Sequence, residues 1–293
     1  MVVSIEELAC FDFIIWLRTG ENAASRLSIS QPKVSRCVHS VSDLLGITLV
    51  KNCGEWFISG DQKLLNLERL VHQEYRWDNG VSLRIESQYY SGPLYLDPAP
   101  NGWITGNFDY LEIHTPLDHL RKGVIDAWIG CYPDVPEQDD FDLCCFHLTR
   151  LPTYLVVSTK HPLVELGNSV TIEDVCRYPS LALTDNAFPK IQSVLQQLKL
   201  WNLPQQTKRY SSKNWEGKVH SDLVVGYATI LSLAFFENPQ VILPVSIPLV
   251  VGDTLVVKRK YSSHPRFADL LQYLQKRAKD LARIHPGVQL SMR

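Results

Sequence analysis

Apolar residues recur at helical spacing through the first 45 residues of the chain and predict three helices. Leu8, Phe11 and Ile15 lie on one stripe and predict an amphipathic helix over residues 4–18, which a Thr-Gly pair ends. A short second helix is predicted over residues 22–27, where two adjacent alanines let another helix approach closely. This arrangement indicates a small helical domain at the N-terminus.

The third helix gives the strongest signal in the chain. It begins after Ser30, which can cap it, and ends at Gly46. One face follows the 3.6-residue period of an α-helix and is apolar: Val34, Cys37, Val38, Val41, Leu44 and Leu45. The opposite face is polar: Pro32, Ser35, Arg36, His39 and Asp43. Residues 22–39 contain basic but no acidic side chains, which makes this segment a local basic patch.

A short helix, a tight turn and a helix with a basic outer face are typical of the helix-turn-helix motif. The second helix of such a motif fits the major groove of DNA. We therefore expect Gln31 to read an adenine through two hydrogen bonds, and Arg36 to read a guanine or to bind a phosphate. The pattern alone leaves a second interpretation open, in which this face is the solvated side of an ordinary three-helix cluster.

Two short strands and a longer helix follow. Residues 47–51 and 56–59 predict a β-hairpin, or wing, in which Lys51 and Trp56 are placed to meet the DNA backbone. The next helix, from residue 61 to about 77, is roughly 25 Å long. It carries one apolar stripe, formed by Leu64, Leu67, Val71 and Tyr75. A lone stripe must be buried against something, and a second copy of the chain is the simplest partner.

The residues of the second and third helices resemble a known family. Residues 23–36 read Ala-Ala-x-x-Leu-x-Ile-Ser-Gln-Pro-x-Val-Ser-Arg, and residues 45–49 read Leu-Gly-x-x-Leu. These motifs resemble the winged helix-turn-helix of LysR-type transcriptional regulators. Pattern and resemblance together give the expected DNA-binding set: Arg26, Ser30, Gln31, Pro32, Lys33, Ser35, Arg36, His39, Lys51 and Trp56.

The chain also departs from the family pattern, which indicates a diverged member. The usual Leu-Glu of the third helix is Val-Ser at residues 41–42, and Asn52 replaces the arginine of the wing. Gly20 stands where an aromatic residue is usual, and Gln62 stands in place of the glycine after the wing. These changes weaken the expected contact of the wing with DNA.

An Asp-Asn-Gly sequence at residues 78–80 marks a boundary, after which strands and helices alternate as in α/β domains. Segments 120–130, 153–163 and 222–228 resemble signatures of the LysR sensor domain, the last of them a helix. The resemblance implies the type II periplasmic-binding-protein fold, with two lobes joined by two crossovers. Residues 89–108 depart most from the family and are expected to form a loop because they are rich in glycine and proline.

The expected domain organisation is α/β overall, with a mainly α winged helix-turn-helix at the N-terminus. We predict a DNA-binding domain at 1–60, a linker or dimerisation helix at 61–78 and an effector domain at 82–293. Within the effector domain, lobe I comprises about 82–151 and 263–293, and lobe II comprises about 152–262.

Effector pockets in this fold lie between the lobes, where helix N-termini offer N–H groups to an anion. On this logic we expect a small polar or anionic effector, and Thr115 is the first residue to test because it precedes a proline at a helix start. The full candidate set is Ser87, Gln88, Ser91, Thr115, Cys131, Thr184 and Ser221. For each of them the alternative is a helix cap or loop hydroxyl that binds no ligand.

Composition limits the other possibilities. The chain is 45% hydrophobic with a net charge of −2, and its seven cysteines have no zinc-binding spacing. We expect no membrane segment, because no apolar run approaches about 18 residues. The first residues lack the pattern of a secretory signal, so we expect a cytoplasmic protein with reduced thiols. Because nucleotide, hydrolase and metal motifs are missing, we expect no enzyme, cofactor or metal.

The sequence therefore predicts a transcription regulator that binds double-stranded DNA as a homodimer or homotetramer and senses a small effector. One alternative is a stand-alone cytoplasmic solute-binding or sensor protein that has lost DNA binding. The intact helix that starts at Ser30 argues against this alternative.

Overall fold

The computed structural model describes residues 2–181, 183–201, 209–211 and 223–291. It divides into two compact units. Unit 1 comprises Met1–Glu86, Ala99–Asn107 and Leu117–Ala127. Unit 2 comprises Ser87–Pro98, Phe108–Pro116 and Trp128–Arg293. The mixed α/β class that the sequence predicted is confirmed.

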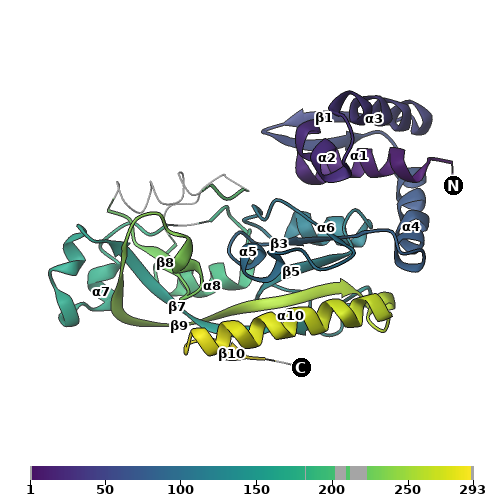
Figure 1. Cartoon of the computed structure of the whole chain (residues 1–293). Coiled ribbons are helices and arrows are strands. Elements are labelled where there is room, and N and C mark those ends of the chain that lie inside the picture. The colour runs from purple at the N-terminus through teal and green to yellow at the C-terminus, as the bar shows by residue number, and fades with distance from the viewer. Residues whose placement is uncertain (1, 182, 202–208, 212–222, 292–293) are drawn as a thin grey trace. The chain divides into compact units, whose positions relative to one another are not determined.

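Unit 1 begins with the expected winged helix-turn-helix, in which three helices pack together beside a hairpin (Figure 1). Its elements are α1 Ile5–Leu17, α2 Gly20–Leu27, α3 Gln31–Leu45, β1 Thr48–Asn52 and β2 Glu55–Ser59. The hairpin strands pair in antiparallel register from Thr48↔Ser59 to Asn52↔Glu55. The linker helix follows as α4 Lys63–Asp78.

Local capping explains where the first helices begin and end. The Ser4 hydroxyl accepts from the Glu7 N–H while the Glu7 carboxylate accepts from the Ser4 N–H, which forms a capping box. Thr19 caps α2, so this helix begins two residues earlier than the sequence predicted. Ser30 precedes α3 as expected, but its side chain makes no capping hydrogen bond. Gly46 ends α3 at φ 64°, a left-handed conformation that favours glycine.

Helix α1 is buried on nearly every side, which the sequence did not predict. Phe11 and Ile15 face a cluster that includes Val41 of α3 and Leu65 of α4. On other sides of the helix, Phe13 and Trp16 are also buried. A helix that is apolar all round belongs in a core rather than at an amphipathic surface.

A buried carboxylate on α1 links three elements of unit 1. Asp12 is 1% exposed and pairs with Arg69 of α4 at 2.8 Å and with Arg84 of β3 Leu83–Ser87 at 3.2 Å. Burial by itself would raise the pKa of Asp12, but the two arginines outweigh it, so the pKa lies below its ordinary value. The aspartate therefore stays charged inside the core.

A second buried pair ties α4 to the same unit. Arg76 donates from Nε to one Asp126 oxygen at 3.0 Å and from a terminal nitrogen to the other at 2.9 Å. Gln73 donates to Asp126 at 3.0 Å, and the Arg84 backbone N–H donates to the same carboxylate at 3.0 Å. The buried face of α4 is therefore held by charge-assisted hydrogen bonds in addition to the apolar packing of Leu65.

Segment 89–108 corrects one expectation. It was predicted to be a loop, but it contains helix α5 Ser91–Leu96 and strand β4 Trp103–Thr105. The proline of the Gly-Pro pair lies in the first turn of α5, where its missing N–H costs nothing. In unit 1, β4 pairs in parallel with β3, from Leu83↔Trp103 to Ile85↔Thr105.

Two further predictions of secondary structure were wrong. The Tyr-Leu-Glu-Ile-His sequence of residues 110–114 predicts a strand but forms none: Tyr110 makes isolated bridges only, and α6 begins within the segment as His114–Arg121. Gly226–Ala228 form strand β8 instead of part of a helix, because they pair with Tyr154–Val156 of a neighbouring strand. Tertiary pairing overrode the local pattern in this segment.

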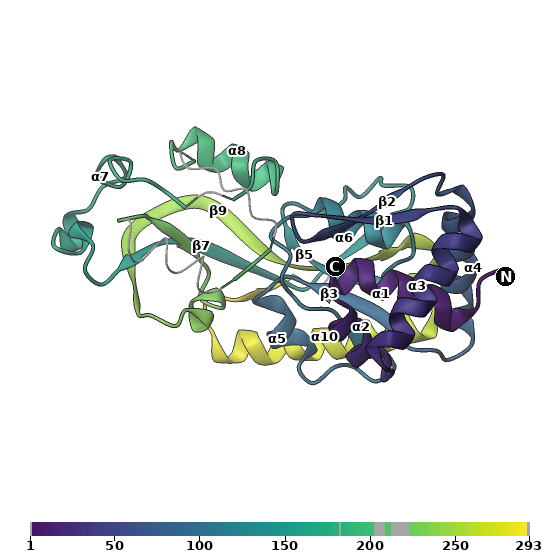
Figure 2. The same ribbon diagram turned by 90° about the horizontal axis from the view of Figure 1, so that it is seen from above.

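Unit 2 is organised around two long antiparallel strands, β7 Thr149–Ser158 and β9 Gln240–Lys258, which lie side by side (Figure 2). Strands β5 Ala127–Tyr132 and β6 Leu143–His147 lie beside β9, while β8 and β10 Gln289–Leu290 pair with β7. The described helices that lie wholly in this unit are α5, α7 Ile172–Val175, α8 Pro189–Gln197 and α10 Pro265–Ile284. Short 3₁₀ turns lie at Pro162–Val164, Gly167–Ser169, Ser232–Phe235 and Arg259–Tyr261.

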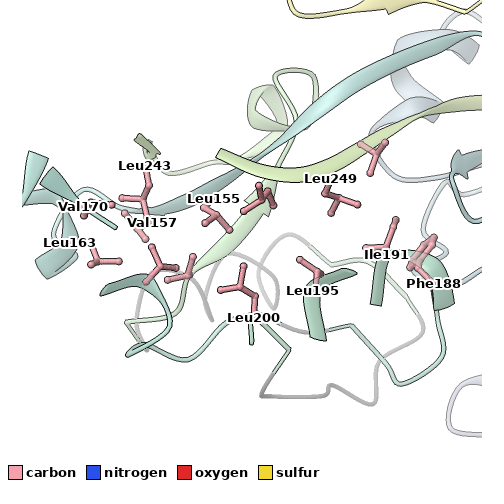
Figure 3. Packing of buried hydrophobic residues seen from close by; sticks show 14 of the residues in the cluster. Leu155, Val157, Leu163, Val170, Phe188, Ile191, Leu195, Leu200, Leu243 and Leu249 are labelled. Carbon is pink, nitrogen blue, oxygen red and sulfur yellow. The ribbon is translucent and has the colours of Figure 1, made fainter. Parts of the chain in front are cut away.

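The main core of unit 2 lies between these strands and α8. Figure 3 shows Phe188, Ile191 and Leu195 of the α8 segment opposite Leu155 of β7 and Leu249 of β9. All five residues are buried. On another side of the unit, Arg277 of α10 donates to the Leu94 carbonyl of α5 at 3.0 Å. Among the described residues, no helix is long and apolar enough to cross a membrane.

Replacing Asp12 should destabilise the protein strongly. Asp12→Ala leaves Arg69 and Arg84 as buried charges without their shared partner, which should cost about 3–5 kcal/mol of the free energy of unfolding. Urea titration measures this loss. Asp43→Ala, at an exposed position of α3, is the control and should change the free energy by less than about 0.5 kcal/mol.

The loss should also depend on pH. Because the folded-state pKa of Asp12 is lowered, its stabilising contribution is present above its unfolded pKa of about 3.9 and disappears as pH falls toward the folded value. The difference between wild type and Asp12→Ala should therefore shrink below about pH 4. An equal difference at pH 7 and pH 3 would contradict a charged Asp12.

Candidate functional site

The outer face of α3 presents the polar side chains that the sequence predicted. Gln31, Pro32, Ser35, Arg36 and His39 are all exposed, while Val34, Cys37 and Val41 on the opposite face are buried. The Arg36 guanidinium has no hydrogen-bond or ion-pair partner among the described residues. This face therefore offers a row of uncommitted polar groups.

The Gln31 side chain rests on the start of α2. A Cβ added at Gly20 would lie 3.1 Å from Cγ of Gln31, which is tighter than ordinary van der Waals contact. The glycine therefore makes room for Gln31 at the first position of α3. This gives a structural reason for Gly20, a departure from the family pattern.

Two predicted DNA-contacting side chains are partly committed to the protein. The Lys33 ammonium pairs with Glu6 of α1, and Arg26 donates to the Gly106 carbonyl at 3.1 Å. Arg26 is nevertheless exposed. Ser30 is also exposed, and its side chain makes no cap.

The two predicted wing residues share a hydrogen-bond acceptor but differ in exposure. The Trp56 indole N–H donates to the Arg18 carbonyl at the end of α1 at 2.9 Å, so Trp56 anchors the wing to the helices. Lys51 is exposed, and its ammonium donates to the same Arg18 carbonyl at 3.5 Å and lies 5.1 Å from the centre of the Trp56 ring. Of these two side chains, only Lys51 offers a charge to a partner.

Helix α4 has an apolar face directed to solvent. Leu64, Leu67 and Val71 are 58%, 52% and 50% exposed, and Leu70 is 40% exposed. Tyr75 is half-buried. The charged face of the helix is the buried one, which inverts the usual arrangement of a surface helix.

Unit 2 contains a pocket with a volume of about 110 Å³. It lies against the strands and helix of the core that Figure 3 shows, with Phe188, Ile191, Leu195 and Leu249 among its walls. The remaining lining residues are Gln88, Tyr89, Tyr90, Tyr110, Leu111, Cys131, Thr153, Leu183, Trp201, Tyr227, Ala228, Thr229, Ser232 and Val251.

The pocket brings together two of the seven predicted effector residues, Gln88 and Cys131. Ser87 is fully buried in β3, and the Ser91 hydroxyl donates to the buried Asp253 carboxylate. Thr184 is half-buried outside the lining, and Ser221 lies outside the described residues. Among the described residues, no group of His, Cys, Asp or Glu could hold a metal ion.

Thr115 does not present free N–H groups, contrary to the sequence-based expectation. Its backbone N–H donates to the two Glu112 carboxylate oxygens at 3.2 and 3.0 Å, and the His114 N–H donates to Glu112 at 2.6 Å. Glu112 is 4% exposed. The start of α6 is therefore already occupied by a carboxylate of the chain itself.

Sequence reasoning missed the aromatic walls of the pocket. Tyr89 stacks on Tyr210 with ring centres 3.9 Å apart, and its edge contacts Tyr90. Trp201 and Tyr227 come from segments far away in the chain. The Tyr-Tyr pair at residues 89–90, one residue after strand β3, was the only sequence signal for this feature, since the other rings are brought in by tertiary packing.

Comparison with known proteins identifies the family. Residues 109–279, more than half of the chain, match the LysR substrate binding domain family. The chain therefore belongs to this family and is a regulator of the LysR type, with an N-terminal helix-turn-helix before its effector-binding domain. A search of curated proteins gives no match.

Solved structures agree on the fold. A cysteine variant of full-length OxyR from Pseudomonas aeruginosa matches with a TM-score of 0.57 and 18% identity, covering 99% of both chains. Full-length CbnR in complex with its target DNA matches with a TM-score of 0.53 and 14% identity, covering 94% of this chain and 100% of CbnR. An OxyR variant from Corynebacterium glutamicum with bound hydrogen peroxide matches with a TM-score of 0.50 and 16% identity, covering 96% of both chains.

The thiol in the pocket should be unreactive. Burial raises the pKa of Cys131 to about 12, and the carboxylates of Asp253 and Asp134 add to the effect. In the folded protein at pH 8, iodoacetamide should modify the exposed Cys53 and leave Cys131 unmodified. Peptide mass spectrometry measures the two sites, with urea-unfolded protein as the control in which both react. Equal labelling in the folded state would contradict a buried, protonated Cys131.

Proposed function

We propose that this LysR-type regulator recognises duplex DNA through the exposed face of α3. The observation that carries the proposal is the row of exposed polar side chains on a helix held in place by α1 and α2. Arg36 and Gln31 would reach base edges, while Lys51 of the wing would contact phosphate. The fold similarity to CbnR, whose structure holds its target DNA, supports this assignment.

We further propose that α4 joins two copies of the chain. A stripe of leucine and valine side chains that are about half exposed gains stability when a second copy covers it. A dimer would place two α3 helices on two half-sites of one operator. The divisions 1–60, 61–78 and 82–293 then act as DNA-binding domain, dimerisation helix and effector domain.

The pocket of unit 2 would hold a small-molecule effector. Concave apolar sites with a few polar groups are typical ligand pockets. The effector would act by binding one conformation of the DNA-bound oligomer more tightly than another, because only differential affinity shifts such an equilibrium. The proposed role is that of a cytoplasmic regulator and involves no catalytic step.

Replacing Arg36 should weaken specific DNA binding. Arg36→Ala should cost about 1–3 kcal/mol and relax the sequence preference if Arg36 reads a base edge. Binding selection from random duplexes, followed by gel-shift titration of the selected site, measures both effects. Lys279→Ala removes one positive charge from an exposed position of α10 and is the matched control. A selection that yields no preferred duplex would support the alternative of a sensor without DNA binding.

Charges on the exposed face of α4 should dissociate the oligomer. Leu67→Glu combined with Val71→Glu places carboxylates where two helices would meet, so the sedimenting mass and the operator affinity should fall together. Ile284→Glu, at a position 64% exposed on α10, should change neither quantity. Wild-type protein that sediments as a monomer at micromolar concentration would contradict the dimer.

A further inference from the structure

We infer that the pocket of unit 2 takes an uncharged ligand with a single aromatic ring that carries a hydrogen-bond acceptor. This inference rests on the proposed role of the pocket as the effector site, and it names the chemical class of the effector. This class of ligand differs from the small polar or anionic effector that the sequence analysis expected from the helix N-termini. Three independent features of the lining support it.

The first feature is charge. The described residues that line the pocket include no aspartate, glutamate, lysine, arginine or histidine. An anionic ligand would lose its hydration there and gain no cation in exchange, which is costly. The nearby Arg209 guanidinium lies over the Tyr110 ring but pairs with Asp109 at 2.7 Å. Its charge is thus already compensated.

The N–H groups at the start of α6, where the sequence analysis expected an anion, are also occupied. The start of α6 bonds to Glu112, whose carboxylate takes the position that an anionic ligand would need. A second carboxylate at this point would be repelled by the first. His114, Thr115 and Glu112 are not among the described lining residues, so this helix start offers the pocket no site for an anion.

The second feature is shape. The pocket volume of about 110 Å³ is close to the roughly 150 Å³ of an engineered apolar cavity that binds benzene. Rings of Tyr89, Phe188, Trp201 and Tyr227 contribute to the walls. Aromatic walls favour a flat ring, because offset stacking and edge contacts add to the gain from burial.

The third feature is a pair of unpartnered polar groups. Gln88 is 5% exposed and Thr153 is 7% exposed, and both line the pocket. The Gln88 side-chain nitrogen and the Thr153 hydroxyl have no hydrogen-bond partner among the described residues. Buried donors of this kind are costly when unsatisfied. A carbonyl oxygen on the ligand would accept from the Gln88 amide and satisfy it.

The test compares three probes on the full chain by calorimetry or ligand-observed NMR. Acetophenone has a ring and a neutral acceptor, benzoate has the same ring with a carboxylate, and toluene has the ring without an acceptor. Acetophenone should bind tightest, with benzoate weaker by at least about tenfold because its charge must be desolvated. Toluene should be weaker by about threefold to tenfold, the value of one hydrogen bond.

Substitutions then locate the interactions. Gln88→Leu should weaken acetophenone by about threefold to tenfold and leave toluene unchanged, because only the acceptor contact is lost. Gln272→Leu, at an exposed position of α10, is the control and should affect no probe. Leu195→Trp fills the pocket and should abolish binding of all three probes, with circular dichroism confirming that the variant folds.

Each outcome decides between the inference and the proposed function. Benzoate binding as tightly as acetophenone, or no probe binding at all, would overturn the neutral aromatic class but leave DNA recognition by α3 untouched. If Gln88→Leu leaves acetophenone binding unchanged, the Gln88 amide does not donate to the ligand, and the part of the inference that requires a hydrogen-bond acceptor is wrong. Acetophenone binding that survives Leu195→Trp would instead show that the pocket is not the ligand site, against the proposed function itself.

Discussion

The carboxylate of Asp12 lies between two arginines in the core of unit 1, and the position of the helix-turn-helix depends on it. Arg69 belongs to α4 and Arg84 to β3, so one aspartate on α1 connects the linker helix with the first strand of the effector region. Breaking a buried pair of this kind leaves charges that nothing compensates. Helix α3 packs on α1, so the charges that hold α1 in place lie buried in unit 1 and away from the exposed face of α3.

Strand β3 and the residue that follows it carry groups that belong to the core of unit 1 and to the pocket. Arg84 bonds to Asp12, the Glu86 carboxylate accepts from the Trp16 indole of α1 at 2.7 Å, and Gln88 lines the pocket two residues later. The covalent distance between the pocket and the anchors of the helix-turn-helix is thus a few residues of one strand.

The sequence predicted the helix-turn-helix well because its signals are local. The period of the apolar residues in α3, the small residues of α2 and the glycine at the end of α3 all act within a few residues of each other. Predictions failed where distant partners decide the conformation. Residues 226–228 pair with β7 and become a strand, and the start of α6 is satisfied by Glu112 instead of remaining free for an anion.

The amino-acid sequence by itself determined the exposed face of α3 and the apolar stripe of α4, because periodicity and capping are properties of neighbouring residues. The class of protein was indicated by the resemblance of residues 23–36 and 45–49 to LysR-type motifs. Tertiary structure alone decided the chemistry of the pocket. Its rings and its two unpartnered polar groups come from segments between Gln88 and Val251, and no local pattern reveals which of these side chains meet. The same holds for Asp12, a charged residue in an otherwise apolar helix. Its two arginine partners lie 57 and 72 residues away in the sequence, and they compensate its charge inside the core.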